Sequence, residues 1–243
     1  MRHARRYAAA AAAALVVSTA ATWWSQRDSN HYLSGETTDF VAIFSAPPPA
    51  DSAQTRAELG ALLTLQRIRT PAEVAAAQAD RRKDISRFLA ALGLDTTHPP
   101  KLPHLQALTD DVEADIGPYL RAAKQKFRRL RPYEIEPKLE PCIDDVKGDL
   151  SYPSGHSTYG YLMSYLLIEM VPEREMLLTR RADEFAHQRM VCGVHFESDI
   201  LAGREAASYL FTTLAVLPDF RRDLDAATSE VRAALGLAQR APR

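Results

Sequence analysis

The most constraining feature of this sequence is the stretch YGYLMSYLLIEMV at residues 159–171, which is apolar on nearly every face of a helix. A helix without a polar face must be covered on all sides by other elements. Pro172 follows directly and ends the helix, because proline has no amide hydrogen to donate. Nothing after residue 30 approaches the length of a membrane span, so the stretch predicts a buried central helix in a protein core.

Helical patterning dominates the rest of the chain. Apolar residues at 3- and 4-residue steps predict helices at 53–67, 71–94, 105–130 (interrupted near Gly117-Pro118), 174–191, 198–217 and 218–237. Residues 132–153, rich in Pro, Gly and charge, are expected to form a loop, and no alternating strand pattern or internal repeat appears. With 243 residues, 46% of them hydrophobic, the expected fold class is all-α: a single-domain helical bundle with a buried central helix and a long N-terminal arm.

The N-terminus has the features of an export signal. Arg2, Arg5 and Arg6 precede an apolar, Ala-rich run, and small residues after that run offer a cleavage site. We therefore expect a signal peptide at 1–22, an extended arm at 23–50, the all-α domain at 51–237 and a tail at 238–243. An uncleaved membrane anchor is the competing interpretation. The favoured one places the protein in the periplasm or outside the cell, with no stable membrane insertion after signal removal.

The chain has two cysteines, Cys142 and Cys192. In an exported protein two cysteines are typical of one disulfide, and a loop of this size would stabilise the fold by roughly 4 kcal/mol in the chain-entropy model. Two buried free thiols are the alternative. Neither cysteine has the CxxC or His spacing of a zinc site.

A basic run stands out against a formal net charge of −1. Residues 121–131 (RAAKQKFRRLR) hold six basic residues and no acidic one, with Arg121, Lys124, Arg128 and Arg131 on one face of a helix. A solvated basic face is the plainest interpretation. Nucleic-acid binding is disfavoured, since the run has a single aromatic residue and the chain is acidic elsewhere.

Two further short stretches carry reactive residue types. In SYPSGHST, residues 151–158, Pro and Gly predict a turn, and a Ser or Thr side chain can cap the following helix. In QRMVCGVHFESD, residues 188–199, His195 and Asp199 are four apart and would share a face if helical. A carboxylate there can hold one imidazole nitrogen and leave the other free to attack, or the pair can simply cap a helix.

Together the three stretches resemble a known three-part phosphatase motif. Lys124, six residues, then Arg131-Pro132; PSGH at 153–156; and Arg189, five residues, His195, three residues, Asp199 are similar to the motif of the type 2 phosphatidic acid phosphatase and vanadium haloperoxidase superfamily. Within it, the chain most resembles the bacterial class A non-specific acid phosphatases, over about residues 46–225. Only 22 residues separate Arg131 from Ser154, which is the compact phosphatase spacing.

The resemblance implies an all-α metal-independent acid phosphatase that hydrolyses phosphate monoesters through a phosphohistidine, with phosphotransferase activity as a secondary property. His195 would be the nucleophile, oriented by Asp199, and His156 would protonate the leaving alcohol and then activate water. An unperturbed histidine near pKa 6.5 suits that acid role at mildly acidic pH. The residues implied in phosphate binding are Lys124, Arg131, Ser154, Gly155 and Arg189.

No metal or cofactor is implied, because the cationic side chains neutralise the phosphate oxygens. Relatives often associate, so the resemblance also allows a homo-oligomer. One departure is Gln188, where the family usually has Ser before its arginine. Rival functions are a vanadate-dependent haloperoxidase, a lipid or diphosphate phosphatase and a non-catalytic phosphate-binding module. The sequence does not identify the physiological substrate.

Overall fold

The structure is a computed structural model that describes residues 32–33, 37–144 and 148–240. The signal peptide expected at 1–22 lies outside the described residues, as do residues 23–31 of the arm and 241–243 of the tail. From Tyr32 onward the chain forms one folded unit.

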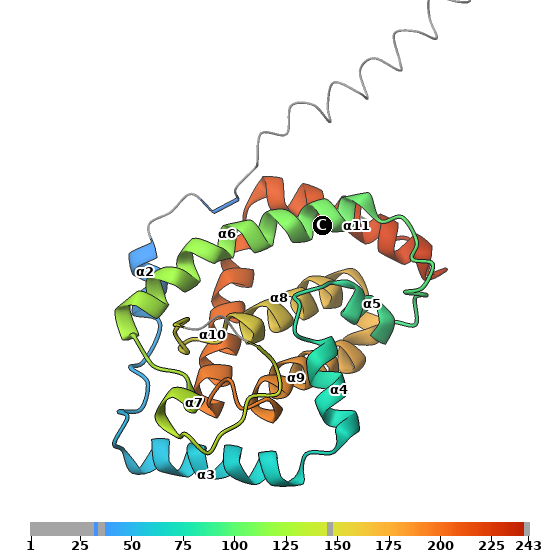
Figure 1. The fold of residues 1–243 in the computed structure, drawn as a ribbon. Helices are drawn as coiled ribbons and strands as arrows, with labels where there is room; N and C mark the ends of the chain where they lie inside the picture. Colours follow the sequence, from blue (N-terminus) through green and yellow to red (C-terminus); the bar gives the residue numbers. More distant parts are fainter. Residues whose placement is uncertain (1–31, 34–36, 145–147, 241–243) are drawn as a thin grey trace, which may run out of the picture. The chain divides into compact units, whose positions relative to one another are not determined.

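Helices make up all the regular secondary structure of the described residues, in which no strand occurs. This confirms the all-α fold class. The elements, drawn in Figure 1, are α2 (Thr37–Ala42), α3 (Ala53–Ile68), α4 (Pro71–Ala79), α5 (Ser86–Ala91), α6 (Pro103–Phe127), α7 (Pro132–Ile135), α8 (Gly155–Met170), the 3-10 turn η1 (Pro172–Arg174), α9 (Glu175–Val191), α10 (Glu197–Leu214) and α11 (Pro218–Ala234).

The helix α8 is the centre of the fold, as its apolar sequence predicts. It packs mainly against α10 and α9 and also contacts α11 and α6 (Figure 1). Leu162, Leu166 and Leu167 are fully buried, and burying a leucine side chain stabilises the fold by about 1.5–3 kcal/mol. The helix starts at Gly155 rather than Tyr159, because the Ser154 hydroxyl accepts a hydrogen bond from the Ser157 amide and caps it.

The arm expected to be extended over 23–50 is partly helical, which corrects that boundary. Residues 37–42 form α2, and Phe40 and Phe44, one helical turn apart, are buried in the core. Phe44 packs edge-on against Tyr152, whose hydroxyl donates to the Ser45 carbonyl at 2.9 Å. Among the described arm residues, 32–33 and 43–50 lie outside the helix, and Phe40 and Phe44 add two buried aromatic side chains to the core.

The helix expected over 71–94 is two helices, α4 and α5, separated near Asp80. The Asp80 carboxylate is 1% exposed and accepts hydrogen bonds from Arg87 Nε at 2.8 Å and Arg181 Nη2 at 2.6 Å. Those bonds turn the chain, since a buried carboxylate needs charged partners. The spacing of apolar residues cannot predict a turn that depends on ion pairs with distant residues.

By contrast, α6 runs without a break through Pro118, where an interruption was expected. Proline removes one backbone hydrogen bond from a helix. Ile116 and Leu120, on either side of the proline, are buried, and α6 packs against α11 and α2. Tertiary packing on both sides of Pro118 outweighs the lost bond.

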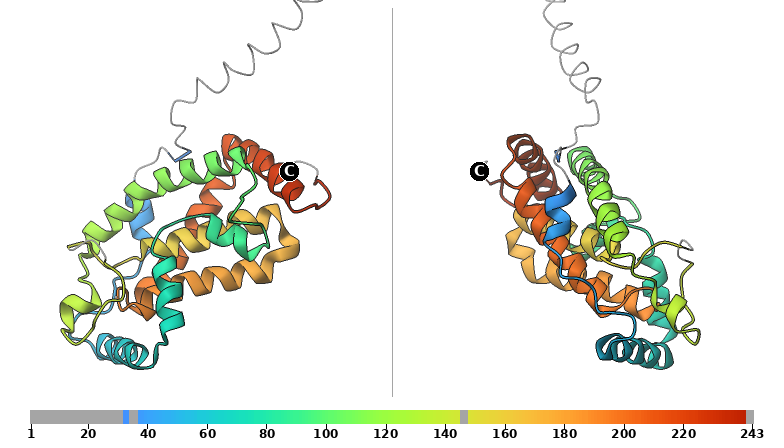
Figure 2. Two further views of the ribbon diagram at one scale, coloured as in Figure 1. Left: turned by 45° about the vertical axis from the view of Figure 1, so that its right-hand side comes forward. Right: turned by 90° about the vertical axis from the view of Figure 1, so that its left-hand side faces the viewer.

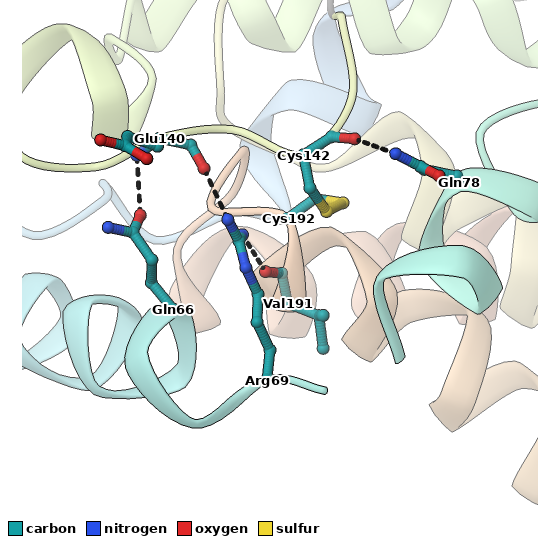
Figure 3. Close-up of a disulfide and its surroundings, with 7 residues drawn as sticks. All are labelled: Gln66, Arg69, Gln78, Glu140, Cys142, Val191 and Cys192. Carbon is teal, nitrogen blue, oxygen red and sulfur yellow. Dashed lines mark hydrogen bonds between the residues drawn. A yellow bond between two sulfur atoms is a disulfide. The ribbon is translucent and has the colours of Figure 1, made fainter. Parts of the chain in front are cut away.

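The connection expected to be a loop over 132–153 contains the short helix α7 and is tied down by the predicted disulfide. Cys142 and Cys192 form the bridge, with Cα atoms 4.7 Å apart, so that expectation is confirmed. Figure 3 shows side chains of the preceding helices holding the same segment: Gln78 donates to the Cys142 carbonyl, and Arg69 donates to the carbonyls of Glu140 and Val191. The connection is therefore fastened to the end of α9.

Figure 2 shows α3 at the opposite end of the folded unit from α11, with α8 and α9 between them. Within the described part of the chain, no single helix combines the length and apolar character of a membrane span. The bent pair α10 and α11, at 101° to each other, meets that length and composition test together.

The helix α10 lies directly against the start of α8 at Gly203. A Cβ added at Gly203 would lie 2.6 Å from the Ser157 Cβ and 2.7 Å from the Ser154 carbonyl oxygen. Both distances are below any normal contact, and one partner is backbone. A residue without a side chain is therefore required where α10 supports the turn that starts α8.

We expect Gly203→Ala to lower the free energy of unfolding by about 1–3 kcal/mol, because the new methyl forces the two helices apart. The matched control is Gly60→Ala. Gly60 is exposed on α3 with nothing near its missing Cβ, so this change should stabilise the protein by about 0.5–1 kcal/mol. Urea unfolding measures both. Equal effects of the two substitutions would contradict the crossing argument.

Candidate active site

Segments at three helix ends come together at the candidate site: the residues after the C-terminus of α6 and those at the N-termini of α8 and α10. The Ser151 amide donates to the Arg129 carbonyl at 2.8 Å, and the Ser154 amide donates to the Asp199 carbonyl at 3.0 Å. These backbone bonds bring the three motifs together. Lys124 and Arg131 come from the first motif, Ser154, Gly155 and His156 from the second, and Arg189, His195 and Asp199 from the third.

His195 and Asp199 interact, but not as two residues on one helical face. His195 precedes α10, whose N-cap is Phe196, and Asp199 lies in the first turn. The Asp199 Oδ2 atom accepts from the Phe196 amide at 2.9 Å and lies 3.3 Å from His195 Nδ1. A carboxylate in the first turn satisfies a helix-start amide and the imidazole at once.

The hydrogen bonds of His195 define which nitrogen carries its proton. Arg131 Nη1 lies 2.7 Å from Nε2, and a guanidinium has only donors, so Nε2 accepts. The proton then sits on Nδ1, which lies 3.3 Å from both Asp199 Oδ2 and Ser151 Oγ. The tautomer leaves the Nε2 lone pair on the side of Arg131.

His195 is neutral in this site. It is 1% exposed, and burial lowers its pKa well below the usual 6.5, with further lowering by the charges of Arg131 and Arg189. A neutral imidazole retains the lone pair that a nucleophile needs.

His156, the expected proton donor, lies beside Phe185 and the connection between α4 and α5. Its ring stacks on Phe185 with centroids 5.9 Å apart, and its Nε2 lies 2.7 Å from the Arg81 carbonyl oxygen. A carbonyl only accepts, so Nε2 carries a proton and Nδ1 is the nitrogen able to gain or lose one. Burial lowers the pKa of His156 well below 6.5, and Arg189 lowers it further.

That shift corrects the expectation of an unperturbed histidine near 6.5. His156 is neutral at mildly acidic pH in the free site, because burial and, to a smaller extent, the positive charges around it oppose its protonation. An anion bound among those charges would cancel their effect. The protonation of His156 is therefore coupled to what the site holds.

Arg131 is held by bonds to several parts of the chain. It is buried, its Nη1 donates to the Val194 carbonyl at 2.8 Å, and its backbone amide donates to Glu134 at 2.8 Å. The helix α6 ends before it, at Phe127, and Arg128 takes a left-handed conformation with φ of 49°. Arg128 and Arg131 therefore do not continue the face that Arg121 and Lys124 start, which corrects the helical interpretation of the basic run.

Sequence reasoning missed Asp149, a carboxylate that lies between two of the expected phosphate ligands. Its Oδ1 and Oδ2 accept from Lys124 Nζ at 2.9 and 2.7 Å, and its Oδ2 also accepts from Arg131 Nη2 at 2.6 Å. Partial burial opposes ionisation, but the two cations outweigh it and lower the pKa of Asp149. The residue lies in the acidic part of the connection before SYPSGHST, where no spacing marks it.

A buried network of ion pairs contacts Asp199 on its Oδ1 atom. Sequence reasoning did not predict this network either. Arg129 Nη1 donates to Asp199 Oδ1 at 2.7 Å, and Arg129 Nη2 donates to Glu58 Oε2 at 3.0 Å. Glu58 also accepts from the Ser198 amide at 2.9 Å, and the Arg129 guanidinium lies 3.9 Å from the Phe196 ring centre. The only sequence signal was the position of Arg129 within the basic run.

The same network bears on the charge of Asp199. Burial raises the pKa of this carboxyl, while Arg129, the Ser151 hydroxyl and the Phe196 amide lower it. The Ser151 hydroxyl donates to Asp199 Oδ2. Burial is the larger effect, so the pKa of Asp199 lies above its usual value, and Arg129 favours the ionised carboxylate beside His195.

The start of α8 supplies the remaining expected groups. Ser154 is buried and caps α8 through its oxygen, which leaves its hydroxyl proton able to donate elsewhere. Gly155 is the first residue of α8, and a Cβ there would meet only Leu120 Cδ1 at an ordinary 3.7 Å. Packing within the protein therefore does not require glycine at this position.

Arg189 lies in the last turn of α9 and is 1% exposed. Its charge acts on both histidines, which places it at the site. Its neighbour Gln188, where the family motif has Ser, has a buried Oε1 with no hydrogen bond to the described residues. Among those residues, no group of three His, Cys, Asp or Glu side chains could hold a metal ion.

Comparisons with known proteins find relatives that match the part of the chain holding the three motifs. Residues 116–222 match the model of the PAP2 superfamily, and this range includes all three motifs. A non-specific acid phosphatase from Providencia stuartii is 31% identical over 212 residues, which cover 82% of this chain and 84% of the relative.

Further relatives carry the same description. A non-specific acid phosphatase from Salmonella typhimurium is 32% identical over 58% of both chains, and an acid phosphatase from Zymomonas mobilis is 34% identical over 60% of this chain and 55% of its own. Among solved structures, a transmembrane PAP2 type phosphatidylglycerolphosphate phosphatase from Bacillus subtilis aligns with a TM-score of 0.48 and 17% identity, over 72% of this chain and 89% of that one.

We expect Glu58→Ala to lower the free energy of unfolding by about 3–5 kcal/mol, because it leaves the buried Arg129 without its second carboxylate. The control is Glu113→Ala, which breaks a half-exposed pair with Lys83 and should cost less than about 1 kcal/mol. Both are measured by urea unfolding at neutral pH. Similar costs for the two variants would contradict a structural role of the Glu58–Arg129 pair.

The two neutral histidines predict a loss of stability on acidification in phosphate-free buffer. Their pKa values are depressed in the native state, so below pH 6.5 the unfolded chain takes up protons that the native site resists. Each histidine then lowers the free energy of unfolding by up to about 1.4 kcal/mol per pH unit. Urea unfolding at pH 7, 6 and 5 measures the slope, which His195→Gln should reduce by about half. An unchanged slope in that variant would contradict the assignment.

Proposed function

Because this chain belongs to the PAP2 superfamily and is a bacterial-type acid phosphatase, we propose that it hydrolyses phosphate monoesters through a phosphohistidine at His195, without a metal ion. The observation that carries the proposal is the hydrogen-bond geometry of the His195 ring. Its Nδ1–H lies toward Asp199 and its Nε2 lone pair lies within 2.7 Å of Arg131. A neutral imidazole in this tautomer, beside cations, is suited to attack on phosphorus.

Phosphate binding is assigned to the cations and to the start of α8. Lys124, Arg131 and Arg189 supply the charge that the three equatorial oxygens of a transferring phosphoryl group require. The Ser154 hydroxyl and the Gly155 amide add donors at a helix N-terminus, where anions bind well. The missing Cβ of Gly155, which protein packing does not explain, lets a phosphate approach the backbone. These side chains take the part that a metal ion plays in other phosphatases.

In the first step His195 Nε2 attacks phosphorus. A P–N bond forms, the bond from phosphorus to the ester oxygen breaks, and the leaving oxygen takes a proton from His156. Asp199 stabilises the positive charge that develops on the imidazole, and Arg129, which donates to Asp199, favours its ionised form. Proton donation of this kind is typically worth about 10²–10⁴ in rate.

The acid role of His156 depends on the bound substrate. In the free site burial and the neighbouring cations keep His156 neutral, whereas a phosphate dianion would cancel part of the cations' charge and raise the pKa of His156. Substrate binding therefore takes up the proton that the leaving alcohol needs. Mildly acidic solution favours that uptake, which accounts for acid phosphatase activity without an unperturbed histidine.

In the second step His156, now neutral, takes a proton from water, which attacks the phosphohistidine and releases inorganic phosphate. An alcohol that replaces water would receive the phosphoryl group instead. Phosphotransferase activity is thus a property of the same intermediate. The proposal does not depend on which alcohol leaves.

The remaining expectations concern the whole protein. We place it in the periplasm or outside the cell, on the basis of the export-signal sequence at 1–22. The Cys142–Cys192 disulfide is consistent with an oxidising compartment. A homo-oligomer remains part of the proposal, and its test is size-exclusion chromatography with light scattering.

We expect His195→Ala to abolish hydrolysis of p-nitrophenyl phosphate, by at least about 10³-fold, because no phosphoenzyme can form. His156→Ala should slow turnover and accumulate phosphohistidine, which intact-protein mass spectrometry detects after an alkaline quench. The control is His98→Ala, since the His98 side chain is 89% exposed and far from this chemistry in sequence. Substantial residual hydrolysis by purified His195→Ala would overturn the proposal.

A further inference from the structure

Asp149 has no place in the proposed reaction, yet its carboxylate is bonded to Lys124 and Arg131, two of the three cations proposed to bind the phosphate. We propose that the Asp149 carboxylate is an intramolecular competitor for the phosphoryl group, and that it sets the affinity of the enzyme for substrate and for released phosphate. The inference rests on the proposed roles of Lys124 and Arg131. It assigns a function to a residue outside the three motifs.

The hydrogen bonds of Asp149 reproduce those expected of a phosphate oxygen. One oxygen atom, Oδ2, accepts from Lys124 Nζ at 2.7 Å and from Arg131 Nη2 at 2.6 Å. Both distances are those of charge-assisted bonds. A phosphate oxygen on the same two donors would have to take the position of Oδ2.

Charge prevents the carboxylate and a phosphate from sharing these donors. The two cations lower the pKa of Asp149, although partial burial opposes them, so the carboxylate remains ionised at the mildly acidic pH of the reaction. Two anions on one pair of donors would repel each other strongly in this partly buried place. Phosphate binding therefore requires Asp149 to give up its bonds.

The surroundings of Asp149 allow that exchange. Its side chain is 40% exposed, so the displaced carboxylate can return to water with little loss. Arg131 keeps its position without it, because Nη1 donates to the Val194 carbonyl and Nε donates to the Asp149 backbone carbonyl at 3.2 Å. The cations stay in place while one acceptor replaces another.

The exchange would also act on His195. In the structure Arg131 Nη1 donates to His195 Nε2, the atom proposed to attack phosphorus. A phosphate that displaces Asp149 gives the guanidinium new acceptors and can draw this N–H away from the imidazole. After the reaction, Asp149 would compete with inorganic phosphate and favour its release. The residue weakens substrate binding and product inhibition together.

The test is calorimetric titration of the purified protein with inorganic phosphate, beside the inhibition constant of phosphate against p-nitrophenyl phosphate. Asp149→Asn should lower the dissociation constant of phosphate, its inhibition constant and the KM of p-nitrophenyl phosphate about tenfold each, because the competing side chain loses its charge. The matched control is Asp144→Asn, an exposed residue of the same connection that removes the same charge. It should leave all three values within about twofold of the wild type, since Lys124 and Arg131 keep their partner.

A background variant shows whether the competition acts through the assigned cations. Lys124→Gln should weaken phosphate binding. Adding Asp149→Asn to that variant should lower the dissociation constant of phosphate by a smaller factor than the same change does in the wild type. Asp149→Ala serves as a second variant if urea unfolding shows that the amide disturbs the fold. It is expected to change phosphate affinity in the same direction.

The outcomes separate this inference from the proposed function. If Lys124→Gln weakens phosphate binding but neither Asp149 variant tightens it, the competitor role is overturned and the phosphate site stands. If Lys124→Gln leaves phosphate binding unchanged, the proposed site itself fails. Equal tightening by Asp149→Asn and Asp144→Asn would assign the effect to net charge and would also overturn the inference.

Discussion

The arrangement of the site depends on one buried carboxylate, Asp199. An ionised group with no exposed surface is strongly destabilising unless every oxygen is paired, and Asp199 draws its donors from three separate stretches of chain. Arg129 follows α6, Ser151 precedes α8, and the Phe196 amide starts α10. Pairing this charge brings the ends of three helices together. Glu58 extends the same network to α3, so a helix from the N-terminal part of the chain also supports the site.

The cations that gather here have two linked consequences. Together with burial, they lower the pKa of His195 and His156, which keeps both imidazoles neutral in the free protein. They also favour a bound anion, and in the free protein the Asp149 carboxylate forms ion pairs with Lys124 and Arg131. A neutral nucleophile and an anion-binding surface are thus two results of one charge arrangement. In the proposed reaction, exchanging Asp149 for a phosphate would change the protonation of His156 without any large movement of the fold.

Several features of the fold and site could be predicted because their causes are local. Residues 159–171 are apolar on nearly every face of a helix, so this helix must be buried in any fold, and α8 is buried. The resemblance to a three-part family motif, carried by residue types at set spacings, predicted the candidate site residues from Lys124 to Asp199. Asp149 and Glu58 could not be found in this way, because their partners lie far away in the sequence; Glu58 and Arg129, for example, are 71 positions apart. The division of 71–94 into α4 and α5 has the same origin, since the Asp80 carboxylate turns the chain toward Arg181.

The sequence by itself determined the all-α class, the central helix and the set of chemical groups available to the site. Helical periodicity and residue type are properties of short segments, so they can be recognised before the chain is folded. The tertiary structure alone decided how those groups are charged and paired. The pKa of His156, the tautomer of His195 and the occupation of Lys124 and Arg131 by Asp149 all depend on burial and on distances between remote segments. Electrostatic interactions in a protein interior are governed by such distances and by solvent access, neither of which is encoded in a local pattern of residues.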